Sequence, residues 1–149
     1  MRPCVYSPGP AAFEDAFVPS AELAAILAYV PADFADPSAD FEHVRRTFAP
    51  FHGHPVRPEL QMDFPELGGV RCGRYTDASL PADARILFHC HGGAFVSCPL
   101  DVYHFYADML LRYTGSAVVM PDYRLAPEHR FPAAHDDCFN AYRGLIESG

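Results

Sequence analysis

The sequence has 149 residues, half of them hydrophobic, which suffices for one domain with a buried core and excludes a disordered chain. Eleven Lys and Arg residues oppose nineteen Asp and Glu residues, and the net charge of -8 argues against binding to nucleic acid or anionic lipid. The N-terminal stretch MRPCVYSPGPAAFEDAF has no apolar run of signal-peptide length. We therefore expect a cytoplasmic protein without membrane insertion.

Two short helices are predicted near the N-terminus. The first follows Ser20 as N-cap, carries apolar residues at helical spacing, and is closed by Pro31. The second places Phe41, Val44 and Phe48 on one side. The proline-rich stretch PFHGHPVRPELQMDFP, residues 50–65, follows them as an irregular connector, and we place the end of the first region, residues 1–58, within it.

The second region, residues 59–149, alternates strands and helices. Strands are predicted over 69–75, 85–91 and 117–120. A helix is predicted from Pro99 to a glycine C-cap at Gly115, and another from Pro132 to the end of the sequence. Because strands and helices alternate, we expect an α/β fold with a mainly parallel sheet and flanking helices.

The strand that ends at His91 runs directly into two glycines and an alanine, in the stretch LFHCHGGAF. Ligands of open parallel sheets lie beyond the carboxyl ends of the strands. Glycines there allow backbone N–H groups to approach a substrate and to stabilise the oxyanion of an acyl-transfer intermediate. The tripeptide His91-Gly92-Gly93 is thus a candidate oxyanion hole, and a simple tight turn is the alternative.

A second motif, DYRLAPEHRFPAA, begins at Asp122 after the next helix and strand. Together the two motifs resemble the hormone-sensitive lipase family of α/β-hydrolases, also called the bacterial type IV esterases, which carry HGGG followed by DYRLAPEHPFPAA. The similarity covers roughly residues 85–145. It implies the N-terminal half of an α/β-hydrolase fold preceded by cap helices. The implied protein is a serine carboxylesterase or lipase that hydrolyses a small-molecule ester and needs no cofactor.

The resemblance also implies roles for single residues. The oxyanion donors fall on the backbone N–H groups of Gly92, Gly93 and Ala94, with the last two as the main donors. His91 supports the loop. Ala94 stands where the family has a third glycine, and since the donor is main chain, the added methyl group removes no hydrogen bond.

The second motif implies a structural turn beside the site, formed by Asp122, Tyr123, Arg124 and Glu128. We expect Arg124 to pair with Glu128 or Asp136 and so fix this turn. Adjacent residues of a helix point in different directions. Of the neighbours Asp136 and Asp137, one should therefore bind the turn and the other face water.

The sequence contains no Gly-x-Ser-x-Gly nucleophile elbow around any of its seven serines. In the resembling family the elbow follows the helix that ends here near Gly149, so we expect a half that lacks the nucleophile Ser, the Asp and the His and is inactive alone. In the family's strand order 1-2-4-3-5, the strand ending at His91 is flanked by the fifth strand, which is absent here. One edge of this strand would therefore be unpaired, which predicts self-association through that edge. The alternatives are a non-catalytic protein that binds a small molecule and an inactive truncated remnant.

Histidine pairs suggest a metal site at first sight. His52 and His54, and likewise His89 and His91, are two residues apart, but no third ligand stands at a suitable spacing, so we expect no metal. The five cysteines are odd in number and form no C-x-x-C motif, which predicts free thiols. They are Cys4, Cys72, Cys90, Cys98 and Cys138. Of these, Cys90 is expected in the core.

Overall fold

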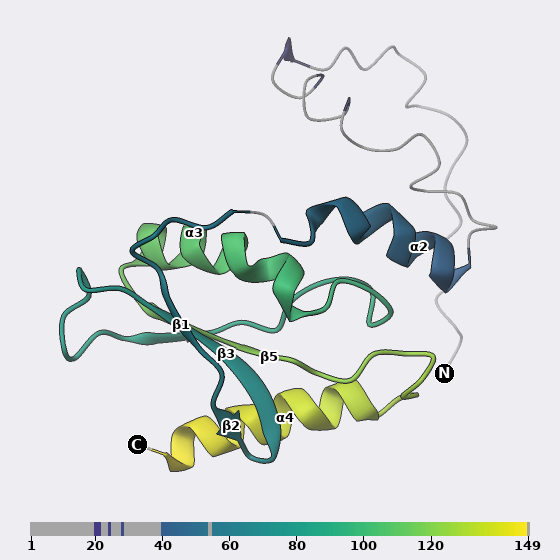
Figure 1. Cartoon of the computed structure of the whole chain (residues 1–149). Coiled ribbons are helices and arrows are strands. Elements are labelled where there is room, and N and C mark those ends of the chain that lie inside the picture. Colours follow the sequence, from purple (N-terminus) through teal and green to yellow (C-terminus); the bar gives the residue numbers. More distant parts are fainter. Residues whose placement is uncertain (1–19, 22–23, 25–27, 29–39, 54, 149) are drawn as a thin grey trace, which may run out of the picture. The chain divides into compact units, whose positions relative to one another are not determined.

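The structure is a computed structural model, and it describes residues 20, 21, 24, 28, 40–53 and 55–148 (Figure 1). Nearly all of these residues belong to one compact unit, Asp36–Gly149. The helix predicted between Ser20 and Pro31 falls largely outside the described residues. The domain boundary at 58/59 stays a prediction.

The centre of this unit is a sheet of five short strands. They are β1 (Gln61–Asp63), β2 (Glu66–Leu67), β3 (Val70–Thr76), β4 (Ile86–Phe88) and β5 (Ala117–Pro121). The strand order is β1-β3-β5-β4, and β2 pairs with β3 beside this path. All three predicted strands are present, but the second, β4, is shorter than expected. The His89 N–H still donates to the Val119 carbonyl, and regular pairing ends after this hydrogen bond.

The sheet is mixed, which corrects the expectation of a mainly parallel sheet. Within the described residues only β4 and β5 run parallel, with Leu87 opposite Val118. The pairings of β3 with β1, β2 and β5 are all antiparallel. Two adjacent strands can run parallel only if a crossover connection joins them, whereas a tight turn gives an antiparallel pair. Among the described elements, α3 (His104–Thr114) forms such a crossover between β4 and β5.

Helices cover both faces of the sheet (Figure 1). On one face lies α3, preceded by the 3₁₀ helix η2 (Leu100–Tyr103) and ended by a left-handed Gly115, as predicted. On the other face lies α4 (Ala133–Glu147), with Pro132 as its N-cap residue. The second predicted N-terminal helix is α2 (Phe41–Phe48), whose N-cap is Asp40; the short 3₁₀ helix η1 (Ala49–Phe51) follows it.

Strand β5 divides the core into two layers. Val118 and Met120 face α3 and pack with Leu111, whereas Val119 faces α4 and packs with Ala141. Successive strand residues point to opposite faces, so a strand covered on both sides must be apolar throughout. This explains the uninterrupted run AVVM in the sequence.

Two glycines allow α4 to approach the turn between β2 and β3. A Cβ atom on Gly144 would lie 2.2 Å from the backbone nitrogen of Gly68, and one on Gly68 would lie 2.1 Å from the Asn140 carbonyl oxygen. No side chain fits at either position. The contact fixes where α4 lies on the sheet.

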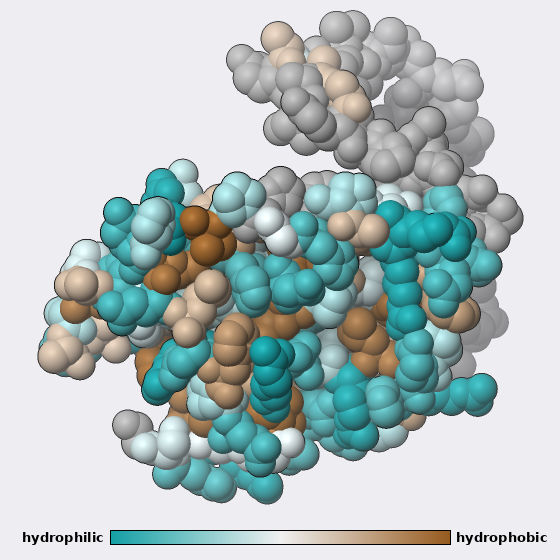
Figure 2. Space-filling model, viewed as in Figure 1, coloured by the Kyte–Doolittle hydropathy of each residue, from teal (hydrophilic) through white to brown (hydrophobic). Residues whose placement is uncertain are grey.

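Strand β4 lies at one end of the strand order, where it pairs only with β5 among the described strands. Ile86 on this strand is 51 % exposed, and α4 carries the exposed apolar residues Phe139, Tyr142 and Ile146. Figure 2 shows apolar atoms between hydrophilic ones on one face of the molecule. No helix among the described residues is long and apolar enough to span a membrane.

Candidate oxyanion-hole site

The chain turns sharply after β4, in a loop from Gly92 to Cys98. Gly93 has a φ of +118°, a backbone conformation that disfavours L side chains, and a Cβ atom there would lie 2.2 Å from the carbonyl oxygen of Ser97. Ala94 and Phe95 follow with φ values of +53° and +62°, and Cys98 has +61°. Such consecutive left-handed residues are costly and are characteristic of functional loops.

Hydrogen bonds to one carbonyl hold this loop in shape. The carbonyl oxygen of Gly93 accepts from the N–H groups of Val96 and Ser97, both at 3.0 Å, and from the Ser97 hydroxyl at 3.1 Å. The Phe95 carbonyl in turn accepts from the Ala126 N–H at 2.8 Å. The loop is therefore stabilised by hydrogen bonds within its own backbone and by one hydrogen bond to the segment after β5.

The N–H groups at the start of the loop are candidate donors. Gly92 lies against the Tyr103 hydroxyl, whose oxygen would be 3.0 Å from a Cβ atom at this position. The N–H groups of Gly93 and Ala94 donate to no acceptor among the described residues. Two adjacent free donors in a fixed loop are what an oxyanion requires.

His91 lies buried below the loop, with only 5 % of its surface exposed. Its Nδ1 lies 2.9 Å from the Gly92 carbonyl oxygen, and its ring stacks on Tyr123 with the ring centres 4.2 Å apart. Burial lowers the pKa of His91, so the ring is neutral at neutral pH. A neutral ring with Nδ1 as donor leaves Nε2 as an acceptor, and Nε2 has no hydrogen-bond partner in the described part of the chain.

The segment after β5 closes against the same loop. The Tyr123 hydroxyl donates to the His91 carbonyl oxygen at 2.7 Å, and burial raises the pKa of Tyr123. Asp122 forms an ion pair with Arg71 at 2.7 Å. The structure thus brings the predicted turn residues Asp122 and Tyr123 next to His91.

The sequence suggested that Arg124 pairs with Glu128 or Asp136. In the structure its partner is Asp137 instead. The backbone N–H, Nε and Nη2 of Arg124 all donate to the Asp137 carboxylate, at 2.8–2.9 Å. Asp137 is buried and Asp136 is exposed, so one of the two acids binds the turn and the other faces water, as predicted. The helical rotation between adjacent residues decides which acid faces the turn.

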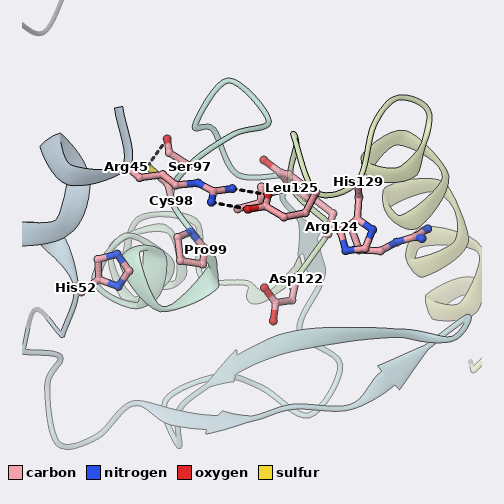
Figure 3. A pocket seen from close by; sticks show the side chains of 11 residues that line it. Arg45, His52, Ser97, Cys98, Pro99, Asp122, Arg124, Leu125 and His129 are labelled. Carbon is pink, nitrogen blue, oxygen red and sulfur yellow. Dashed lines mark hydrogen bonds and ion pairs between the residues drawn. The ribbon is translucent and has the colours of Figure 1, made fainter. Parts of the chain in front are cut away.

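Sequence reasoning missed Arg45 on α2, which is the partner of Glu128. Its guanidinium donates to both carboxylate oxygens of Glu128 at 2.7 Å (Figure 3). It also donates to the carbonyl oxygens of Val96 at 2.8 Å and Ala126 at 3.0 Å. One side chain therefore joins α2 to both loops of the site.

We expect Arg45→Ala to release Glu128. The hydrogen bonds from Arg45 lower the pKa of Glu128 to about 2, and without them it should rise towards the ordinary value of about 4.3. Carboxyl chemical shifts followed by NMR as a function of pH measure this change. The exposed neighbour Arg46 provides the control: Arg46→Ala should leave the Glu128 titration as it is. An unchanged Glu128 pKa in Arg45→Ala would contradict the contact.

Two hollows adjoin the loop, and Cys98 lines both. The larger has a volume of about 540 Å³, and charged residues are among those that line it, including Arg45, Asp122 and His129 (Figure 3). The smaller, of about 180 Å³, is apolar and is lined by Val102 and Tyr103 of η2, by Phe105 and Tyr106 of α3, and by Phe48 and Cys98.

Of the histidines and cysteines singled out in the sequence, His54 and Cys4 lie outside the described residues. His52 pairs with Asp101 at 2.8 Å, and His89 packs against Tyr106. In the described part of the chain no three His, Cys, Asp or Glu side chains converge on a common metal position. Cys98 is buried, but Cys90 is exposed rather than in the core, because it lies beyond the last residue of β4 at the edge of the sheet.

Comparison with known proteins gives a consistent result. A family model described as an alpha/beta hydrolase fold matches residues 87–149. An esterase of Acinetobacter venetianus is 37% identical over 95 residues, covering 64% of this chain and 31% of its own length. Esterase LipI of Mycobacterium tuberculosis is 35% identical over 115 residues, covering 72% of this chain and 36% of its own length.

Solved structures agree with the sequence matches. An esterase from the bacterial hormone-sensitive lipase family aligns with a TM-score of 0.72 and 26% identity, over 89% of this chain and 44% of that one. A hormone-sensitive lipase from a metagenome library aligns with a TM-score of 0.68 and 30% identity, over 85% and 42%. The chain thus spans about a third of the two curated relatives and less than half of these solved chains.

Proposed function

Because the chain belongs to the hormone-sensitive lipase family of α/β-hydrolases, we propose that it forms the oxyanion-hole half of a serine carboxylesterase. The substrate is a small-molecule ester. The cytoplasmic location and the assignment of residues 1–58 to a cap and connector, with 59–149 as the incomplete hydrolase core, are part of this proposal.

The observation that carries the proposal is the pair of unpartnered N–H groups on Gly93 and Ala94, just beyond the end of β4. These donors would bind the oxyanion that forms when a nucleophile attacks the ester carbonyl. Each such donor contributes on the order of 3 kcal/mol to transition-state stabilisation.

The surrounding residues would keep these donors in place. His91 holds the Gly92 carbonyl through Nδ1, and Tyr123 holds the His91 carbonyl through its hydroxyl. Arg124 and Glu128 act from further away, through Asp137 and Arg45 respectively. In the proposed mechanism these side chains position the loop and take no part in the chemical step.

The attacking group lies outside these 149 residues in this proposal. A serine nucleophile requires an elbow that exposes its hydroxyl and a histidine that takes its proton, and the sequence has no Gly-x-Ser-x-Gly. We therefore expect no turnover of p-nitrophenyl butyrate by the purified chain beyond the buffer rate. Hydrolysis that persists after treatment with a serine-directed inhibitor would contradict this expectation.

Strand β4 should also mediate self-association of the isolated chain. Its outer edge is unpaired among the described strands, and such edges pair with other chains. We expect oligomers in sedimentation velocity and a shift towards monomer in Ile86→Lys, which places a charge on the edge. Tyr113→Lys, at a residue 80 % exposed on α3, is the matched control and should still associate. A monodisperse wild-type monomer with sharp cooperative unfolding would refute the prediction.

A further inference from the structure

Cys90 and Cys138 come from different elements that face each other. Along β4 and the residues after it, Leu87 packs into the layer under α3 and His89 contacts Tyr106 of α3. Phe88, between them, packs into the layer under α4. Side chains alternate along an extended chain, so Cys90 follows Phe88 onto the α4 face.

Ring packing fixes the register of α4 against this segment. Phe88 and Tyr142 meet edge to face, with ring centres 5.6 Å apart. Cys90 lies two extended residues beyond Phe88, about 6.6 Å along the chain. Cys138 lies four residues before Tyr142 on the same side of the helix, about 6 Å along its axis. The two spacings match, which sets Cys138 opposite Cys90.

Hydrogen bonds made by the segment after β5 also place Cys90 near Cys138. His91, next to Cys90, accepts from the Tyr123 hydroxyl through its carbonyl oxygen. Asp137, next to Cys138, accepts from Arg124. Because Tyr123 and Arg124 are consecutive, the neighbours of the two cysteines are fastened to one point of the chain.

We propose that Cys90 and Cys138 are a reversible disulfide site, closed by a small disulfide such as oxidised glutathione. Both residues are thiols in this structure, and Cys90 is exposed whereas Cys138 is half-buried. Burial and, next in size, the charge of Cys90 raise the pKa of the Cys138 thiol to about 12, which agrees with the register that places the two residues opposite each other.

The exposed Cys90 reacts first. Its thiolate attacks one sulfur of oxidised glutathione, the glutathione S–S bond breaks, and one glutathione thiolate leaves. The charge on Cys90 has then gone, which removes one cause of the high Cys138 pKa. Cys138 loses its proton, attacks the Cys90 sulfur, and expels the second glutathione. In total the protein loses two protons and two electrons, which together are two hydrogen atoms, and one glutathione disulfide is reduced to two thiols.

The link would fasten the base of the Gly92–Cys98 loop to α4. A cross-link between residues this far apart in sequence restricts the unfolded chain, so the oxidised protein should unfold at higher urea concentration than the reduced protein. Dithiothreitol should reverse the shift. This inference does not depend on esterase activity and can be tested on the isolated chain.

The test is mass spectrometry of the native 149-residue chain after incubation with oxidised glutathione and acid quenching. We expect the loss of two hydrogens and a peptide pair joining Cys90 to Cys138. In Cys138→Ser the reaction should stop at a glutathione adduct on Cys90, and in Cys90→Ser no internal link should form. Cys98→Ser, which removes a nearby buried thiol, is the matched control and should form the link as the wild type does.

Three results would overturn the proposal. The first is a glutathione adduct that persists on Cys90 of the wild type while Cys138 stays a thiol. The second is a link from Cys90 to a different cysteine or to a second copy of the chain. The third is the same loss of two hydrogens in Cys138→Ser. The wild-type peptide map decides the question even where a variant fails to fold.

Discussion

Gly93→Ala should destabilise the chain more than the addition of a methyl group at any other position of the site. The backbone at this position has a φ of +118°, and the new Cβ would lie 2.2 Å from the Ser97 carbonyl oxygen, which is backbone and cannot move aside. The loop would have to open and lose the hydrogen bonds to the Gly93 carbonyl. We expect the free energy of unfolding in urea to fall by about 3 kcal/mol.

Gly69→Ala separates backbone strain from the clash. Gly69 also has a positive φ, +81°, but a Cβ there would meet nothing within 4 Å. Strain alone should cost about 1 kcal/mol. Equal losses in the two variants would show that the loop after β4 is not packed as described.

The second large effect is expected for Asp137→Ala. Asp137 is 6 % exposed and accepts three hydrogen bonds from Arg124, one of them from the backbone. Its loss would free the turn after β5 from the start of α4. We expect the free energy of unfolding to fall by about 2 to 3 kcal/mol, measured by urea unfolding at neutral pH.

The neighbour Asp136 provides a matched control, because its exposed carboxylate pairs with the adjacent His135 rather than with the turn. Asp136→Ala should change the free energy of unfolding by less than about 0.5 kcal/mol. Comparable losses in the two alanine variants would contradict the assignment of Asp137 to the turn.

The pH dependence of the Asp137 effect has a definite sign. Hydrogen bonds from Arg124 lower the pKa of Asp137 in the folded chain. A carboxyl with a lowered pKa stabilises the fold above its unfolded value of about 3.9 and loses this contribution as the pH falls through its folded pKa. The difference in free energy of unfolding between the wild type and Asp137→Ala should therefore become smaller as the pH falls into the acid range. A difference that grows as the pH falls would contradict this interpretation.

The sequence predicts those parts of the fold that depend on local patterns. Gly115 ends α3 in the left-handed conformation, and Pro132 precedes the first turn of α4, as glycine and proline chemistry require. The glycines after β4 mark the loop for the same reason. Strand direction depends on pairing between distant segments, so the antiparallel pairing of β3 with β5 was missed.

The side-chain partners in the site depend on distances that sequence patterns do not contain. Arg45 lies 51 residues from Val96 and 83 from Glu128, so nothing local links them. The choice of Asp137 over Asp136 follows from the rotation of α4 against the turn. Cys90 was expected in the core as an inert buried thiol, but its position beyond the end of β4 at the sheet edge leaves it exposed.

The most direct test of the esterase proposal is to read the coding sequence for about sixty codons after Gly149 and to assay the whole encoded protein. We predict a short apolar strand followed by a Gly-x-Ser-x-Gly elbow. The longer protein should hydrolyse p-nitrophenyl butyrate, and a serine-directed inhibitor should abolish the activity. An open reading frame that continues without such an elbow, or a complete protein whose hydrolysis resists the inhibitor, would contradict the assignment of this chain to a serine esterase.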